Sequence, residues 1–327
     1  MNTRFKRILT TFVAIGAVLG VAHTARAEYP ERPITLVVGF PAGQSSDLIA
    51  RLVAQKLQQS LGQPLVVENN AGAGGIIGTL YVKNAKPDGY TLLMTSSGPM
   101  AVNPGLYSSL AYDPLNDFEP ISLLTTVPYF LAVHRDFPVN SVSELVELAK
   151  AKPGEINYGS AGNGVTSHLA MELFKSAHGL NMPHIPYKGS PPAVNDLIAG
   201  RIDVMIDNGA ALLTHIQSGR VRALAVTTRS RISAAPSVPT LQEAGMDNFE
   251  IIGWTGLAAP KGTPPAVLQT LQKALAENWK DAPDVRDRLF VLANESAFME
   301  TDAFRSYMSS EIEKWNHAVQ ISGARVD

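Results

Sequence analysis

The stretch VVGFPAGQSSDLIARLVAQKL, residues 37–57, runs from a β-branched apolar segment through small and polar residues into an amphipathic segment. Leu48, Leu52 and Leu57 are close to helical spacing, which predicts a helix directly after a strand. The stretch NYGSAGNGVTSHLAMELF, residues 157–174, repeats this order of strand, small polar loop and helix. Two such units indicate an α/β protein whose loops lie at the carboxyl ends of parallel strands.

The neighbouring segments continue the alternation of strands and helices. Apolar, β-branched runs predict strands at 33–40, 64–69 and 89–97, and amphipathic runs predict helices at 47–62 and 74–86 between them. This order predicts a mainly parallel sheet with right-handed crossover connections.

Two long apolar segments, 118–136 and 249–262, flank a middle block that has its own strand–helix alternation. We expect both to be crossing strands that link two mainly parallel sheets. The predicted architecture is therefore two-lobed, with a discontinuous first lobe (28–128 and 250–327) and an inserted second lobe (129–249). The length of the chain agrees, because one hydrophobic core seldom serves about 300 residues.

Residues 1–27 have the pattern of a secretory signal peptide. The basic MNTRFKR precedes the apolar ILTTFVAIGAVLGVA, and ARA supplies a small-x-small cleavage site. We expect cleavage between Ala27 and Glu28 and a periplasmic mature protein; an uncleaved anchor helix is the alternative. The sequence contains no cysteine, which excludes disulfides.

The charge of the mature chain excludes some classes of partner. Removal of Arg4, Lys6, Arg7 and Arg26 from the 27 basic residues leaves 23 basic against 29 acidic residues. This acidic balance argues against nucleic acid or an anionic membrane surface as partner. An anionic ligand would have to be attracted by local dipoles rather than by the overall charge.

The loop GFPAGQSSD, residues 39–47, is a candidate anion site. It precedes the first turn of a helix, where unpaired N–H groups and the helix dipole favour negative charge. Ordinary helix capping by Ser45 or Ser46 is the alternative. The candidate ligand-binding residues here are Phe40, Ala42, Gly43, Gln44, Ser45, Ser46 and Asp47.

The loop GSAGNGVTSH, residues 159–168, repeats the arrangement in the second lobe. A helix cap requires one or two small polar residues, and this loop contains more. Two facing helix N-termini, one in each lobe, could hold a small anion between them. The candidate ligand-binding residues in this loop are Ser160, Gly162, Asn163, Gly164, Thr166 and Ser167.

Five further candidates follow predicted strands. Ser96 and Ser97 end a strand where a cleft wall is expected, although loop polarity would also explain them. Tyr187 and Lys188 follow another strand; Lys188 could pair with a carboxylate or be a solvated turn residue. Asp207 could accept from a ligand amine or hydroxyl, or cap the next helix.

Three other motifs do not reach the pattern that their chemistry requires. The glycines of AGAGGIIG, residues 71–78, miss the dinucleotide-binding spacing. Tyr158 stands where a nucleophile elbow needs glycine. The histidines show no metal-type clustering, so we expect no metal and no cofactor. A secreted α/β hydrolase using Ser160 and His168 remains an alternative function.

Five stretches taken together resemble the periplasmic solute-binding proteins of the tripartite tricarboxylate transporters, the TctC or Bug family. They are YPERPITLVVGFPAGQSSDLIARLVA, VVENNAGAGGIIGTLYVKNAKPDGYTLLM, NYGSAGNGVTSHLAMELF, IPYKGSPPAVNDLIAGRIDVMID and WTGLAAPKGTPPAV. The resemblance implies a Venus-flytrap fold that closes on a small carboxylic acid. It also implies that the two loops hold the ligand carboxylate through backbone amides, hydroxyls and ordered waters.

The resemblance leads to an expected function and leaves alternatives. We expect a monomeric, non-enzymatic protein that captures a mono- or dicarboxylic, aromatic or amino acid for a tripartite tricarboxylate-type membrane permease. A ligand sensor on the same fold is an alternative. Two positions depart from the family pattern: Gly43-Gln44 replaces a Gly-Gly pair, and Asn70-Ala71 replaces the common Arg-Pro. Gln44 could therefore place its amide in the pocket.

Overall fold

The computed structural model describes residues 29–247 and 249–325. The predicted signal peptide lies outside these residues. The residues from Arg32 onward form one compact unit. Within the described residues, no helix combines the length and the apolar character needed to cross a membrane.

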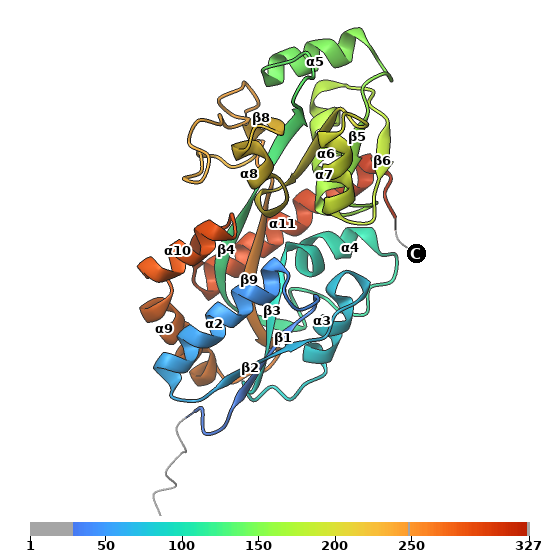
Figure 1. Ribbon diagram of the computed structural model, residues 1–327. Helices are drawn as coiled ribbons and strands as arrows, with labels where there is room; N and C mark the ends of the chain where they lie inside the picture. The colour runs from blue at the N-terminus through green and yellow to red at the C-terminus, as the bar shows by residue number, and fades with distance from the viewer. Residues whose placement is uncertain (1–28, 248, 326–327) are drawn as a thin grey trace, which may run out of the picture. The chain divides into compact units, whose positions relative to one another are not determined.

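Strands and helices alternate along most of this unit, as the periodicity of the sequence predicts (Figure 1). The strands are β1 (Ile34–Val38), β2 (Leu65–Asn69), β3 (Thr91–Ser96), β4 (Phe118–His134), β5 (Tyr158–Ser160), β6 (His184–Pro186), β7 (Val204–Asn208), β8 (Val221–Val226), β9 (Ile252–Pro260) and β10 (Glu295–Met299). The α-helices are α2 (Ser45–Leu61), α3 (Ile76–Lys83), α4 (Asn103–Leu106), α5 (Val142–Ala151), α6 (Thr166–His178), α7 (Ser190–Ile198), α8 (Gly209–Gln217), α9 (Pro265–Asn278), α10 (Pro283–Val291) and α11 (Thr301–Ser322). A short 3-10 turn, η1 (Ala73–Gly75), precedes α3, and a π-helical turn, η2 (Gly98–Val102), precedes α4.

The ten strands form one hydrogen-bonded network that β4 divides into two segments. Up to Pro128, β4 pairs with β9 and β10; from Tyr129 onward it pairs with β7 and β8. The first sheet segment therefore has the order β2-β1-β3-β9-β4-β10, and the second sheet segment has the order β8-β4-β7-β5-β6.

The α/β fold is confirmed, and its pairing is mixed rather than mainly parallel. The β1–β2, β1–β3, β5–β6 and β5–β7 pairs are parallel, as the strand–helix–strand units require. All pairs that involve β4 or β9 are antiparallel. The two strands expected to link the sheets are thus the ones that break the parallel order.

The prediction that residues 249–262 form a strand linking the two sheets is only partly correct. β9 starts at Ile252 and pairs only with strands of the first sheet segment. The contact with the second segment is made just before β9, where the N–H of Ile251 donates to Thr227 O at 3.2 Å. β4, with 17 residues, is the strand that belongs to both segments.

Helix α11 connects the two segments on one side. It packs against η2 and α4, which follow β3, and against α6 of the second segment. Its buried Glu311 accepts hydrogen bonds from Trp254 Nε1 at 3.2 Å and from Trp315 Nε1 at 3.1 Å, and it forms an ion pair with Lys314. Two indole donors and a cation thus satisfy the one carboxylate buried in this interface.

Candidate functional site

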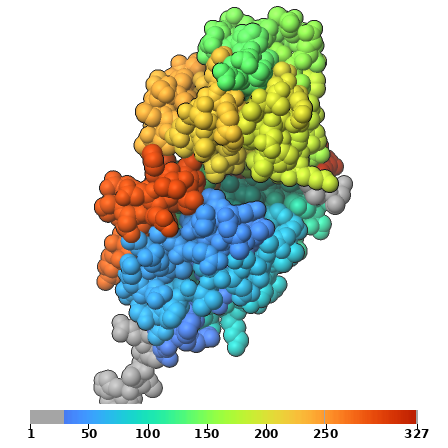
Figure 2. Space-filling view, in the orientation of Figure 1, coloured from blue at the N-terminus to red at the C-terminus, as the bar shows by residue number. Residues whose placement is uncertain are grey.

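A pocket of about 420 Å³ lies between the first sheet segment and the residues that follow β5. The surface in Figure 2 is hollowed along the same boundary, between the blue and teal atoms of one segment and the yellow-green atoms of the other. The first segment and its helices contribute Phe40, Gly74, Ser96, Ser97, Gly98, Val102, Asn103, Leu106 and Tyr107; the other side contributes Asn163, Gly164, Val165 and Thr166. This volume lies within the range of small-molecule sites in proteins.

The second loop, residues 159–168, enters the pocket with the N-terminus of α6. Val165 is the N-cap of the helix, and its side chain makes no capping hydrogen bond. The first-turn N–H groups therefore have no partner within the helix and carry the positive end of its dipole. Asn163 and Thr166 border this end of the pocket, so the position can accept an anion.

Serine hydroxyls inside the second loop fix its shape rather than face the pocket. Ser167 Oγ accepts from Ala161 N at 3.0 Å, and Ser160 Oγ accepts from Gly162 N at 3.2 Å. Both serines are buried and neither lines the pocket. Ser160, Gly162 and Ser167 thus hold the backbone that Asn163, Gly164 and Thr166 present.

Two stacked histidines, His168 and His184, hydrogen-bond to the second loop. The rings of His168 and His184 are 4.1 Å apart and nearly parallel, and Tyr158 stacks on His184 at 4.7 Å. His168 Nδ1 accepts from Gly164 N at 3.1 Å, and His184 Nε2 lies 2.6 Å from Ser160 Oγ. Burial lowers the pKa of His168, and burial together with the neighbouring His168 lowers the pKa of His184 to about 4.

The first loop, residues 39–47, is braced by a buried carboxylate. Asp47 is 1 % exposed and accepts from Gly43 N at 2.8 Å, from Asn69 Nδ2 at 3.0 Å and from Arg51. Burial opposes ionisation of Asp47, but these hydrogen bonds outweigh it and hold its pKa below the ordinary value. Asp47 therefore joins the first loop to Asn69 of β2 and Arg51 of α2 and does not line the pocket.

The first loop contributes only Phe40 to the pocket. Pro41 to Gln44 are exposed, and Gln44 is the N-cap of α2 without a side-chain cap hydrogen bond. Ser45 Oγ accepts from Asn294 Nδ2 at 3.1 Å. The structure thus leaves Ala42, Gly43, Gln44, Ser45, Ser46 and Asp47 outside the pocket lining.

Glycines in the segment 72–78 bring its backbone close to the end of β1. A Cβ atom at Gly39 would lie 2.9 Å from Gly75 O, and one at Gly78 would lie 2.8 Å from Gly39 Cα. This close approach explains the glycines that look like a dinucleotide fingerprint. It also places Gly74 in the pocket wall, which the sequence analysis did not predict.

The sequence did not predict the pocket wall that η2, α4 and the following Tyr107 form. Val102, Leu106 and Tyr107 line the pocket, with Asn103 between them. A Cβ atom at Gly164 would lie 2.6 Å from Leu106 Cδ1, so Leu106 rests against the second loop. The apolar spacing of Val102 and Leu106, one helical turn apart, is the one sequence signal for this wall.

The remaining predicted residues lie outside the pocket. Tyr187 donates from its hydroxyl to Asp196 at 2.8 Å and from its N–H to Ser160 O at 3.0 Å, and Lys188 is exposed. Asp207 is 1 % exposed and accepts from Asn208 N at 2.7 Å, while burial raises its pKa to about 6. Of the predicted residues, Phe40, Ser96, Ser97, Asn163, Gly164 and Thr166 line the pocket.

The geometry does not favour a hydrolase. Ser160 is fully buried, donates to Gly162 O at 3.0 Å and contacts His184 rather than His168. A nucleophile needs access to substrate, and this serine lies behind the loop that borders the pocket.

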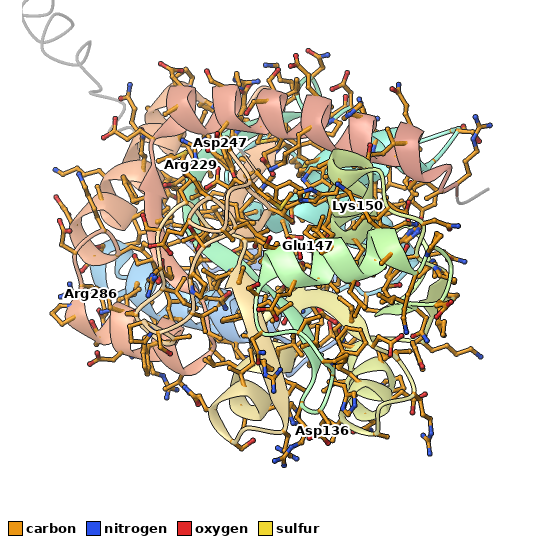
Figure 3. The ribbon with its side chains drawn as sticks, turned by 90° about the horizontal axis from the view of Figure 1, so that it is seen from above. Asp136, Glu147, Lys150, Arg229, Asp247 and Arg286 are labelled. Atoms are coloured by element: carbon orange, nitrogen blue, oxygen red, sulfur yellow. The ribbon has the colours of Figure 1, made fainter. Side chains whose placement is uncertain are left out.

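Charged side chains lie away from the pocket. The side chains of Asp136, Glu147, Lys150, Arg229 and Arg286, which Figure 3 labels, are exposed. None of the pocket-lining residues is acidic or basic. Among the residues that the structure describes, no group of acidic residues and histidines could hold a metal ion. Any anion in this pocket is therefore held by dipoles and neutral donors.

A family model and a curated relative place the chain in the same protein family. The sequence model of the family "TctC: Tripartite tricarboxylate transporter family receptor" matches residues 49–323. Protein BugT of Bordetella pertussis is 38% identical over 327 residues, covering 99% of each chain.

Solved structures with the same fold include two that contain a carboxylic acid. Rpa4515 of R. palustris with adipate is 34% identical, with a TM-score of 0.79 and coverage of 91% of this chain and 100% of that chain. MatC from Rhodopseudomonas palustris with bound malate is 32% identical, with a TM-score of 0.73 and coverage of 89% and 100%.

Proposed function

The chain belongs to the TctC family of tripartite tricarboxylate transporter receptors, and from this premise we propose that it captures a small carboxylate in the pocket beside α6. Proteins of this family are periplasmic solute-binding proteins that serve transport, not enzymes. The ligand would be passed to a membrane permease of the tripartite tricarboxylate type.

The observation that carries this proposal is the composition of the pocket. One wall is the open N-terminus of α6, and the lining contains no acidic or basic side chain. Such a site favours an anion that accepts hydrogen bonds from N–H groups and hydroxyls. The structures of relatives with adipate and with bound malate support a carboxylate as that anion.

We expect the first loop to reach the ligand only when the two lobes close. We propose that the lobes 28–128 with 250–327 and 129–249 approach each other when the ligand binds. This movement would bring the first turn of α2, which follows the first loop, towards the carboxylate held by α6. Gln44, Ser45 and Ser46 would then contact the ligand, directly or through water.

We also propose that the mature protein acts in the periplasm as a monomer, after removal of residues 1–27. The basic start, apolar centre and small-x-small end of this segment support export. Capture in the periplasm would place the loaded protein beside the permease.

Calorimetry with malate, adipate, hexanoate, benzoate and aspartate tests the function. We expect at least one to bind the mature protein. Asn163→Asp should weaken that binding about tenfold or more, because a second negative charge beside the carboxylate costs ~1.4 kcal/mol or more. Asn140→Asp, an exposed residue ahead of α5, changes the net charge equally and should not alter affinity.

Two results would contradict the proposal. Failure of a broad set of small carboxylates to bind the folded wild type would remove the ligand class. Equal affinities for wild type and Asn163→Asp would show that the carboxylate does not sit at the N-terminus of α6.

A further inference from the structure

We propose that this pocket selects monocarboxylates with an uncharged, apolar body, and that Val102, Leu106 and Tyr107 determine this specificity. The inference rests on the proposed function, because it takes the carboxylate to sit at α6. The inference concerns the part of the ligand beyond its carboxylate, which the two loops do not contact.

The first argument is the number of charges that the site can balance. A helix N-terminus is equivalent to roughly half a positive charge. The N-terminus of α6 therefore supplies about half a charge, and α2, whose first turn already carries the ionised Asp47, adds less than that, so the two together balance one carboxylate at most. No lysine, arginine or histidine lines the pocket to balance a second, and an uncompensated buried carboxylate is strongly unfavourable.

The second argument is that the side-chain amide of the far wall, that of Asn103, is already in use. Asn103 is 4 % exposed, and its Nδ2 donates to Gly74 O at 3.3 Å and lies 3.4 Å from the hydroxyl of Tyr112. The Tyr112 hydroxyl in turn donates to Pro99 O at 2.6 Å. These donors hold the wall together and are not available for a second carboxylate.

The third argument is the apolar character of the surface beside the anion site. Val102 and Leu106 are almost completely buried, and Leu106 packs directly on Gly164 of the second loop. Tyr107 borders the same pocket and is partly exposed. Because this wall touches the loop that would hold the carboxylate, the apolar body must begin within a carbon or two of the carboxyl group.

A matched pair of ligands tests the inference. Hexanoate and adipate share a six-carbon chain and differ by one terminal carboxylate. We expect calorimetry to show hexanoate binding the wild type at least tenfold more tightly than adipate. Within the series from butanoate to hexanoate, affinity should rise about fourfold per CH₂ group, since each buried group contributes about 0.8 kcal/mol.

A variant of the wall tests the assignment to residues. Tyr107→Arg places a cation at the apolar end, so it should weaken hexanoate and reverse the preference towards adipate. Tyr81→Arg makes the same change at a tyrosine of α3 that is 50 % exposed and outside the pocket, and should leave both affinities unchanged. If Tyr107→Arg does not fold, Val102→Thr, which keeps the shape of the side chain, should weaken hexanoate several-fold.

The outcomes separate this inference from the proposed function. Adipate binding as tightly as hexanoate, or more tightly, overturns the inference and leaves the carboxylate function intact. The same holds if other carboxylates bind and hexanoate does not. If no carboxylate binds the folded wild type, the function itself fails. An unchanged preference in Tyr107→Arg and an unchanged hexanoate affinity in Val102→Thr would remove these residues from the specificity site.

Discussion

Gly164 sets the distance between the second loop and the apolar wall. Its φ of +73° lies in the left-handed region, which costs roughly 1 kcal/mol for a residue with a side chain. A Cβ atom there would also overlap Leu106, with 2.6 Å to Cδ1. Both features make glycine necessary at the position where the anion site and the apolar wall meet.

We expect Gly164→Ala to destabilise the protein by ~2–4 kcal/mol, the sum of the backbone cost and the cost of overpacking. Urea unfolding measures this loss. Gly179→Ala is the matched control, because Gly179 ends the same helix at φ +65° and no atom lies within 4 Å of its Cβ position. It should cost only ~1 kcal/mol.

The double variant Gly164→Ala with Leu106→Ala separates the two causes. It should recover the part of the loss that comes from the overlap, visible as a coupling between the single changes. Equal losses for Gly164→Ala and Gly179→Ala, without coupling to Leu106, would contradict the contact.

At the scale of elements, the N-terminus of α6 depends on the histidine pair beneath it. The stack of Tyr158, His184 and His168, in which His184 is partly exposed, borders Glu172, which accepts from the Tyr158 hydroxyl and from Lys175 Nζ. Protonation of His168 would remove the acceptor for the N–H of Gly164. The second loop is therefore most secure when both imidazoles are neutral.

The pH dependence of stability follows from the depressed pKa of His184. The folded value is about 4 and the unfolded value about 6.5, so the unfolded chain binds the proton first as the pH falls. The contribution of the neutral ring is complete above pH ~6.5 and is lost between pH ~6.5 and ~4. His168, whose pKa is also lowered by burial, acts in the same direction.

We expect His184→Gln, which can still hydrogen-bond to Ser160, to flatten the stability profile. Between pH 7 and 4 the wild type should lose up to about 3 kcal/mol more than the variant, measured by urea unfolding at each pH. From pH 7 to 9 the two profiles should run parallel, which serves as the internal control. Parallel profiles across the acidic range as well would rule out His184 as the titrating group.

Sequence reasoning succeeded where a feature is encoded locally. The small polar residues before α6 predicted a loop that enters the pocket, and β-branched runs located β1, β2 and β3. It missed η2 and α4 because the pairs Gly98-Pro99 and Pro104-Gly105, which flank the segment, are typical of a loop. The contact between Leu106 and Gly164 joins residues 58 positions apart, which no local pattern reveals.

At the scale of the whole molecule, β4 and α11 join the two sheet segments. The sequence suggested this organisation through its two long apolar segments. It did not show which of the two segments crosses between the sheets. A central strand such as β9, which lies between β3 and β4, is buried and is therefore as apolar as a crossing strand. All nine residues of β9 are buried. Any closure must therefore bend the chain near Pro128 and between Thr227 and Ile251.

Closure of the two lobes gives the prediction at this scale. If the first loop reaches the ligand only by closing, saturating ligand should lower the radius of gyration measured by small-angle X-ray scattering. The same ligand at about 100 times its Kd should stabilise the fold by ~2.7 kcal/mol, a rise in Tm of about 4 °C for a chain of this length. Asn163→Asp, which would be at only about 10 times its Kd at the same ligand concentration, should be stabilised by ~1.4 kcal/mol at most, about half the wild-type gain. A rise in Tm with unchanged scattering would mean that the ligand binds without closure, and the role proposed for Gln44, Ser45 and Ser46 would then fall while the pocket beside α6 would stand.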